Sequence, residues 1–354
     1  MTHSVDRSGA PSRTEAVTLH DVAREAGVAV STVSRALSNP DRVSSRTREH
    51  VQAVARRLDY RPNRIAQALP SGRTRMLALL VSDITNPHNF GLIRGAEAQA
   101  RAAGYTLVLG DSQGSAELES DHADRIGSAV DGLVLASSRL PEDALRAVGG
   151  RRPVVLYNRE ADGFASVVTD SDDGSRQIVE HLAALGHPSI AYLGGPPDAW
   201  SDAERGQALE RHSAAAGIAF TRLGPFSPTV DHGEAAADVG IASGATALIA
   251  FNDLLAIGVL RRLEHLGIAV PADVSVVGYD DIFGSDFCHP PLTTVTSPSE
   301  QAGRALIDVL LGSRHDARVV LPTSLRVRDS TAPAPAHPPS RSHRPDGPAA
   351  SRRP

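Results

Sequence analysis

The spacing of hydrophobic positions changes near residue 76 of this 354-residue chain. Before that point, apolar residues recur every three or four positions, as in Val51, Val54, Ala55 and Leu58, which is the spacing of one helix face. After it, short continuous apolar runs alternate with segments of helical spacing. Continuous runs are typical of strands buried on both faces, and hence of parallel sheet. The pattern predicts a small all-α head followed by a doubly wound α/β body.

Three short helices are expected in the head. The first covers residues 19–26, and Gly27 permits the positive φ of a tight turn. The second lies in 27–37, where Val33 and Leu37 are spaced for burial while most of one face consists of the hydroxyls of Ser31, Thr32 and Ser34 plus Arg35. Two helices joined by such a turn, the second with polar side chains outward, form a helix-turn-helix that reads a DNA major groove.

Side chains facing away from the head's core are the candidates for DNA contact. Arg35 is long enough for a bidentate bond to guanine, and Val30 suits a thymine methyl group. The positions expected to meet DNA are Thr18, Leu19, Val30, Ser31, Thr32, Ser34, Arg35, Asn39, Ser44, Thr47 and Arg48. Thr18 and either Ser44 or Ser45 are also N-cap candidates. The alternative is a helical bundle with a solvated polar helix.

Eight apolar runs predict the strands of the body. They read MLALLVSD, YTLVLGD, DGLVLAS, PVVLYNR, SVVTD, SIAYLGG, TALIAFND and VSVVGYDD. The helices expected between them include 91–103, 174–185, 253–266 and 300–311. About 250 residues exceed one typical sheet, so two subdomains are expected.

The net charge of −5 conceals an uneven distribution. Residues 17–76 carry eleven arginines against five acidic residues, whereas residues 77–330 have a net charge of −14. A basic head on an acidic body indicates that the head meets a polyanion. Residues 1–16 and the Pro-rich, Ser-rich and Ala-rich segment 331–354 have no periodicity, and both are expected to be disordered.

Several classes of protein are disfavoured by the composition. No apolar run approaches the length of a membrane span, and the N-terminus has no hydrophobic signal segment. A single cysteine, Cys288, excludes an internal disulfide framework and fits a cytoplasmic protein. No nucleotide-binding, nucleophile or metal-ligand motif is present, so neither an enzyme nor a metal or cofactor is expected.

Polar residues follow several of the expected strands, at the edge where open parallel sheets bind ligands. They are Asp83, Asn158, Arg159, Asn252, Asp253 and Asp280. Such groups could form paired hydrogen bonds to the hydroxyls of a sugar. Phe90, Trp200 and Phe226 are the aromatic candidates for stacking on it. The alternative for each strand-end residue is a helix N-cap, which is at least as good an interpretation for Asp253 and Asp281.

The chain resembles the lactose repressor/galactose repressor (LacI/GalR) family. The resemblance begins at "VTLHDVAREAGVAVSTVSRALSNPDRV" and continues through "SDITNP", "LGHPSIAYLGGP", "FNDLLAIG", "VPADVSVVGYDD" and "PPLTTV". It implies a helix-turn-helix head on a periplasmic-binding-protein-like core. It also implies a homodimer that binds a pseudo-palindromic DNA operator under control of a small-molecule effector.

The resemblance also implies roles for particular residues. Asn63, Ala66 and Leu69 match a hinge helix that enters the minor groove, although Pro70 follows the leucine directly. The positions that match effector-holding residues are Asn158, Arg205, Asn252 and Asp280. Two departures concern the effector: Ser297 stands where many members have glutamine, and 224–233 is longer than usual.

These observations combine into one domain plan. It comprises a disordered 1–16, a helix-turn-helix in 17–61, a hinge helix and linker in 62–75, a core in 76–330 and a disordered tail in 331–354. The core's N-subdomain takes about 76–168 plus 298–322, and its C-subdomain about 169–297 plus 323–330. The predicted function is repression of sugar-metabolism genes under control of a sugar. The alternatives are a regulator answering to a purine corepressor and a sugar-binding protein without a regulatory role.

Overall fold

The computed structural model describes residues 17–38, 42–60, 73–312 and 317–336. By its internal contacts the chain divides after Thr74 into a small N-terminal unit, the head, and a large unit, the core. None of the helices in the described ranges combines the length and hydropathy needed to span a membrane.

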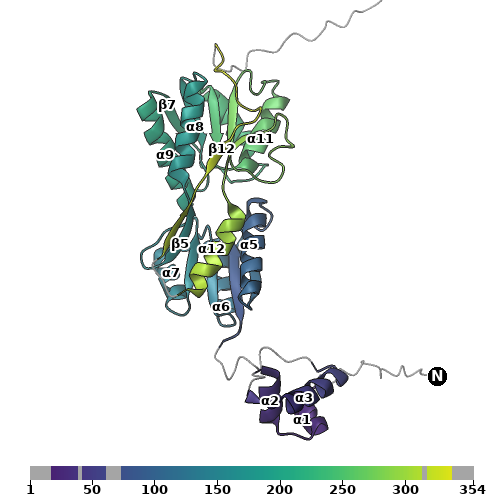
Figure 1. Ribbon diagram of the computed structural model, residues 1–354. Coiled ribbons are helices and arrows are strands. Elements are labelled where there is room, and N and C mark those ends of the chain that lie inside the picture. Colours follow the sequence, from purple (N-terminus) through teal and green to yellow (C-terminus); the bar gives the residue numbers. More distant parts are fainter. Residues whose placement is uncertain (1–16, 39–41, 61–72, 313–316, 337–354) are drawn as a thin grey trace, which may run out of the picture. The chain divides into compact units, whose positions relative to one another are not determined.

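In the described residues the head contains the three expected helices, α1 (Leu19–Ala26), α2 (Val30–Ser38) and α3 (Ser45–Arg57) (Figure 1). Gly27 ends α1 in the left-handed conformation, with φ of 64°. Val22, Val33 and Val51, one from each helix, are fully buried at the centre of the head. The periodic apolar positions therefore fix how the three helices pack.

The core contains two six-stranded sheets, one in each subdomain. The N-subdomain sheet has the order β11-β5-β4-β3-β1-β2, and all of its pairs are parallel. Its strands are β1 (Met76–Val81), β2 (Thr106–Asp111), β3 (Gly132–Ala136), β4 (Val154–Tyr157), β5 (Ala165–Thr169) and β11 (Arg318–Leu321). Helices α5 (His88–Ala102) and α12 (Ser299–Leu311) cover one face, and α6 (Ala116–Gly127) and α7 (Glu142–Gly149) cover the other.

The C-subdomain sheet has the order β12-β10-β9-β8-β6-β7, and only β12 is antiparallel to its neighbour. Its strands are β6 (Ser189–Leu193), β7 (Ala219–Leu223), β8 (Ala247–Ala250), β9 (Ser275–Asp280), β10 (Thr293–Thr296) and β12 (Ser324–Arg326). Its helices are α8 (Ser171–Ala184), α9 (Trp200–Ala216), α10 (Gly233–Ala242) and α11 (Asp253–His265). The expected fold class is confirmed.

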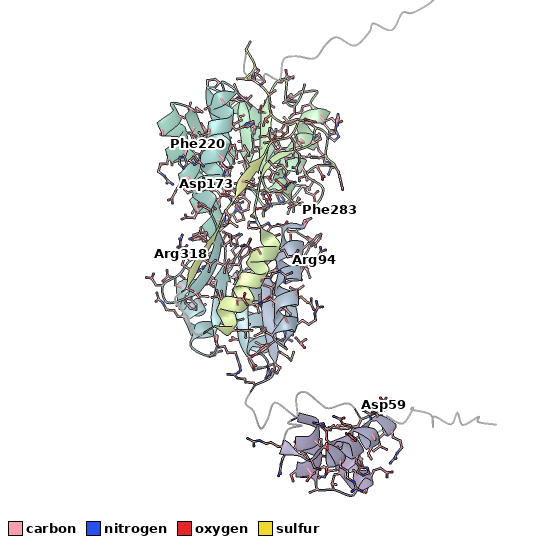
Figure 2. The ribbon with its side chains drawn as sticks, in the orientation of Figure 1. Asp59, Arg94, Asp173, Phe220, Phe283 and Arg318 are labelled. Atoms are coloured by element: carbon pink, nitrogen blue, oxygen red, sulfur yellow. The ribbon has the colours of Figure 1, made fainter. Side chains whose placement is uncertain are left out.

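Three segments connect the subdomains, between β5 and α8, between β10 and α12, and between β11 and β12 (Figure 1). The strands on either side therefore lie in different sheets although they are near in sequence. Arg318, on β11 and labelled in Figure 2, pairs with Glu160 at 2.5 Å within the N-subdomain.

Glycine allows α5 and α12 to approach closely. A Cβ atom on Gly95 of α5 would lie 2.0 Å from the carbonyl oxygen of Glu300, and one on Gly303 of α12 would lie 2.2 Å from that of Leu92. No side chain larger than hydrogen fits at either position without movement of backbone.

The C-terminal boundary differs from the expected one. Residues 331–336, assigned from composition to a disordered tail, pack on the C-subdomain. His187 Nε2 donates to the carbonyl of Ala332 at 3.1 Å, and the amide of Ala334 donates to Leu185. These hydrogen bonds tie the segment down despite its low complexity. The segments 1–16 and 337–354, also expected to be disordered, lie outside the described residues.

Candidate DNA-binding surface and effector site

Helix α2 has one buried face and one exposed hydroxyl-and-arginine face. Val33 and Ala36 are 0% and 1% exposed, whereas Ser31, Ser34 and Arg35 are exposed. Val30 and Thr32 are half-buried at the start of the helix. Packing therefore holds α2 while its outer face stays accessible.

Two of the expected DNA contacts also cap helices. Thr18 caps α1 in a capping box with Asp21, in which Oγ1 of Thr18 accepts from the amide of Asp21 at 3.3 Å and Oδ2 of Asp21 accepts from the amide of Thr18 at 2.9 Å. Ser44 caps α3, and its Oγ accepts a hydrogen bond from the amide of Thr47 at 3.3 Å. These bonds fix where each helix begins, near the backbone amides that suit phosphate.

The other expected contacts divide into two groups. Leu19 is half-buried against the core of the head, and Arg48 is half-buried on α3. Asn39 and the proposed hinge residues Asn63, Ala66 and Leu69, with Pro70, lie outside the described residues.

A cavity of about 650 Å³ lies between the two sheets of the core, at the carboxyl ends of their strands. Both subdomains supply its wall, which includes Ser82, Asp83, Thr85, Asn86, His88, Asn89, Asp111, Gln113, Ser137, Arg139 and Asn158 from one side. The other side includes Pro196, Ser201, Arg205, Ser227, Pro228, Thr229, His232, Phe251, Asn252 and Asp280. Most of these residues carry hydroxyl, amide or charged side chains.

Arg205 is the most constrained charged group of this wall. Its Nη1 donates to the carbonyl of Phe251 at 2.6 Å, and its Nη2 to Oδ1 of Asp280 at 3.1 Å. The guanidinium carbon lies 3.7 Å from the centre of the Tyr279 ring. Burial lowers the pKa of Arg205, but the charge and hydrogen bond of Asp280 and the electrostatic effects of Tyr279 and Tyr192 together more than offset burial, so the net pKa is raised. Nε is buried and has no hydrogen-bond partner among the described residues.

Two of the asparagines of the wall, Asn158 and Asn252, also have structural roles. Oδ1 of Asn158 accepts from the amide of Thr169 at 3.0 Å, next to the first connection between subdomains. Asn252 is the N-cap of α11, where its Oδ1 accepts from Leu255 and its Nδ2 donates to Pro228. Each amide keeps hydrogen-bonding capacity toward the cavity.

Neighbouring acidic residues divide between the cavity and the protein interior. Asp253 is 0% exposed and accepts from the amide of Ile282 and from Thr294 Oγ1, so it is a structural group rather than the cap. Asp281 pairs with Arg328 at 2.5 Å, away from Asp280. Among the described residues, no cluster of His, Cys, Asp and Glu could hold a metal.

The aromatic candidates Phe90, Trp200 and Phe226 are not among the residues that line the cavity, whereas Phe251 is. Phe90 is 49% exposed on α5, because the neighbouring Asn89 takes the inward position. Phe226 packs on the hydrophobic core of the C-subdomain. On α9 the cavity-lining residues are Ser201 and Arg205, four positions apart, and Trp200 lies beside that stripe.

Sequence reasoning also missed residues that connect the two walls. His88, in the first turn of α5, stacks on Tyr157 and places its Nδ1 3.7 Å from Asp280 Oδ1 in the other subdomain. Arg139, after β3, donates to Asp198 of the other subdomain at 3.0 Å. Both residues follow a strand by several positions. Including the residues a few positions beyond each strand end, and not only those directly after it, would have identified them.

Buried tyrosines surround Arg205 and remain protonated. Burial is the main cause that raises the pKa of Tyr157, and it raises the pKa of Tyr279 to about 12. Their hydroxyls are therefore hydrogen-bonding groups, not charges.

Comparison with known families places both units. Residues 18–63 match the family of bacterial regulatory proteins called the lacI family, and residues 179–331 match the periplasmic binding protein-like domain. The boundaries correspond to the three-helix head and to most of the C-subdomain.

Curated relatives cover nearly the whole chain. The HTH-type transcriptional repressor CytR of Escherichia coli (strain K12) is 32% identical over 335 residues, covering 90% of this chain and 98% of the relative. The HTH-type transcriptional regulator CelR of Thermobifida fusca is 33% identical, covering 88% and 98%.

Solved structures are also similar to nearly the whole chain. A lac repressor dimer bound to operator and the anti-inducer ONPF has a TM-score of 0.81 and 30% identity, covering 90% of this chain and 100% of that one. A complex of the transcriptional regulator CelR with cellobiose has a TM-score of 0.67 and 31% identity, covering 89% and 99%. The chain therefore belongs to the lacI family, whose members are DNA-binding transcriptional regulators and not enzymes.

Proposed function

We propose that this regulator is a homodimeric repressor that binds a pseudo-palindromic operator and is controlled by a sugar in the core cavity. The observation that carries the proposal is the presence in one chain of an exposed hydroxyl-and-arginine helix and a polar cavity. The lac repressor dimer on its operator and the CelR–cellobiose complex support the two halves. Such a repressor acts on chromosomal DNA, so we place it in the cytoplasm.

On DNA, α2 lies in the major groove with its N-terminal residues at the base edges. Arg35 reads a guanine, Ser31 and Thr32 bond bases or phosphates, and Arg48 neutralises a phosphate. The proposed hinge residues Asn63, Ala66 and Leu69 enter the minor groove between the half-sites. Two-fold symmetry of the protein then matches that of the operator.

Control of DNA binding follows from the two walls of the cavity. A sugar that bonds His88 or Asn158 on one wall and Arg205 or Asn252 on the other binds best when the subdomains are held together. The ligand can change operator affinity only by as much as it prefers one arrangement of the subdomains to another. We expect the sugar to lower operator affinity.

A purine corepressor is the second candidate, and curated relatives named PurR give it support. A nucleobase needs a flat apolar surface on which to stack. Among the described residues that line the cavity, Phe251 is the one that carries a phenyl ring for such stacking. The many hydroxyl and amide groups of that wall favour a sugar.

The test is to measure operator binding by fluorescence anisotropy while titrating a panel of sugars and nucleobases. At least one sugar should lower the affinity, and Arg205→Ala should abolish that response while leaving operator binding in place. No change with any sugar would reject sugar control, and an increase with a nucleobase would establish the second candidate.

A further inference from the structure

The charged side chains of the cavity wall differ in whether the protein already neutralises them. Arg205 pairs with Asp280 at 3.1 Å, and Arg139 pairs with Asp198 at 3.0 Å. Both arginine side chains are more than nine-tenths buried, with exposed fractions of 4% and 8%. Any anion that approached Arg205 would also meet the carboxylate of Asp280. Neither arginine therefore offers the cavity an uncompensated positive charge.

Asp83 and Asp111 have no such compensation. Oδ1 of Asp83 accepts from the amide and hydroxyl of Thr85, at 2.8 and 2.6 Å. Oδ1 of Asp111 accepts from the amides of Ile84 and Gln113. Within the described part of the chain, neither carboxylate has an arginine or histidine partner within 4.0 Å. Both line the cavity, so the wall of the N-subdomain presents two negative charges to a ligand.

The helix N-termini of the wall that carries Asp83 and Asp111 do not reverse this balance. Free amides at a helix N-terminus attract anions. On the opposite wall, α9 and α10 begin beside Ser201 and His232 without a side-chain cap, whereas α5, α6 and α11 have side-chain acceptors. Oγ of Ser115 accepts from the amide of Leu118 in α6, and Oδ1 of Asn252 accepts from Leu255 in α11. Oδ1 of Asn86 accepts from the amide of His88 in α5.

We propose that the effector carries hydroxyl groups and no anionic group, because Asp83 and Asp111 exclude phosphate esters and carboxylates from the cavity. The inference rests on the proposed function, since it concerns the ligand of the same site. Arg205 lines the cavity, and its buried Nε has no hydrogen-bond partner among the described residues. Phosphorylation or oxidation of a bound sugar should therefore weaken binding at least tenfold.

Matched pairs of compounds test the inference on the full chain. Glucose, ribose, cellobiose and trehalose would be compared with glucose 6-phosphate, glucuronate, ribose 5-phosphate, cellobionate and trehalose 6-phosphate by calorimetry and by operator release. The expected result is that binders come from the neutral set and that their anionic counterparts bind at least tenfold more weakly. An anionic compound that binds and releases operator, while its neutral counterpart does not, would overturn the inference and leave the proposed function intact. Absence of a binder in both sets counts against sugar control itself and against the inference with it.

Two variants connect the selectivity to the residues named. Asp83→Asn and Asp111→Asn keep the Oδ1 acceptor but remove a negative charge, so each should narrow the difference between a neutral binder and its anionic counterpart by threefold or more. Asp121→Asn on α6 removes the same charge from an exposed i, i+4 pair with Arg125 and is the matched control, which should leave the difference unchanged. Equal selectivity in all three variants and the unmodified protein would refute the role of both aspartates, and operator binding verifies that each variant is folded.

Discussion

Oδ1 of Asp280 lies 3.1 Å from Nη2 of Arg205, and the two side chains are 8% and 4% exposed. Removing one member of a buried ion pair leaves an unpaired charge in the interior, which typically costs about 3–5 kcal/mol. Asp280→Ala should therefore lower the free energy of unfolding by that amount in urea titrations. Asp280→Asn, which keeps an acceptor, should cost less.

The double variant Arg205→Met with Asp280→Ala tests whether the loss comes from the unpaired charge. Because no charge is left buried, the double variant should be more stable than Asp280→Ala alone. A double variant that loses the sum of the two single changes would show that packing, not charge, dominates at this position.

The ion pair between Arg139 and Asp198 joins the two subdomains at 3.0 Å. Asp198 is 59% exposed, so solvent screens the pair and its contribution should not exceed about 1 kcal/mol. An effector that touches both walls of the cavity binds best when the two subdomains are held together, and the ion pair between Arg139 and Asp198 favours that arrangement. Asp198→Asn should therefore weaken effector binding by up to about fivefold in calorimetry. Glu142→Gln, which breaks an ion pair with Arg146 inside one helix, should have no effect on binding.

The contact between α5 and α12 depends on glycine. Gly95→Ala would bring a Cβ atom to 2.0 Å from the carbonyl oxygen of Glu300, so the helices must separate, at a cost of about 1–3 kcal/mol. Gly127→Ala is the control within another helix, α6, because its nearest neighbour would be a side-chain atom of Leu133 at 3.9 Å. That variant should be neutral or stabilised by up to about 1 kcal/mol. Equal stability of the two variants in urea would contradict the prediction.

Most of the strands that the sequence pattern predicts have continuous apolar runs buried on both faces, and the exception is β2, a half-buried edge strand. The four that it missed are short, lie at sheet edges or carry polar side chains. β7 is an edge strand with exposed positions, and β10 buries Thr293 and Thr294 completely. Those hydroxyls are satisfied by hydrogen bonds from distant parts of the chain, such as Thr294 Oγ1 to Asp253 Oδ1 at 2.6 Å. No local pattern contains that information.

The sequence predicts part of the candidate site, as it predicts part of the strand set. Asp83, Asn158, Asn252 and Asp280 could be named because the carboxyl end of a parallel strand is a fixed place in this fold. Phe251 lies at a strand end, directly after β8, so the same rule reaches it, whereas Phe90 and Trp200 lie on α5 and α9, and the packing of those helices decides that they do not line the cavity. His88 and Arg139 meet partners from the other subdomain, which only the three connecting segments bring near.

Two histidines hold the segment that follows β12. Nε2 of His181 lies 3.0 Å from Thr331 Oγ1, and His187 donates to the carbonyl of Ala332. Burial lowers the pKa of both histidines below 6.5. Between 6.5 and the lowered values the unfolded chain binds more protons than the folded one, so their contribution to stability is lost as pH falls.

The free energy of unfolding should therefore respond to these histidines as pH is lowered from 7.5 to 5. Glu119, whose pKa burial raises, acts in the opposite direction, so the difference between two proteins is the quantity to measure. A variant with His181→Gln and His187→Gln should lose less stability over this range than the unmodified chain. Parallel pH profiles for the two proteins would be evidence against the prediction.

Arg35 and Arg48 separate recognition of base sequence from attraction to the DNA backbone. Arg35 is exposed on α2 beside the hydroxyl side chains, whereas Arg48 is half-buried in the first turn of α3, whose cap is Ser44. Arg35→Ala should cost about 1–3 kcal/mol on the operator and relax the preference at one base position, with little change on random DNA. Arg48→Ala should weaken binding to every sequence alike and reduce the dependence of affinity on salt by about one ion.

Anisotropy titrations with operator and random duplexes at several salt concentrations distinguish the two roles. Arg101→Ala, in the core, removes the same charge from an exposed pair with Glu97 and should leave both affinities unchanged. If Arg35→Ala weakened binding to operator and to random DNA equally, Arg35 would contact phosphate rather than a base. The sequence specificity of α2 would then have to come from the hydroxyl side chains of that helix. Because a base contact is lost only on the cognate sequence, the ratio of the two affinities, not either affinity alone, decides the assignment.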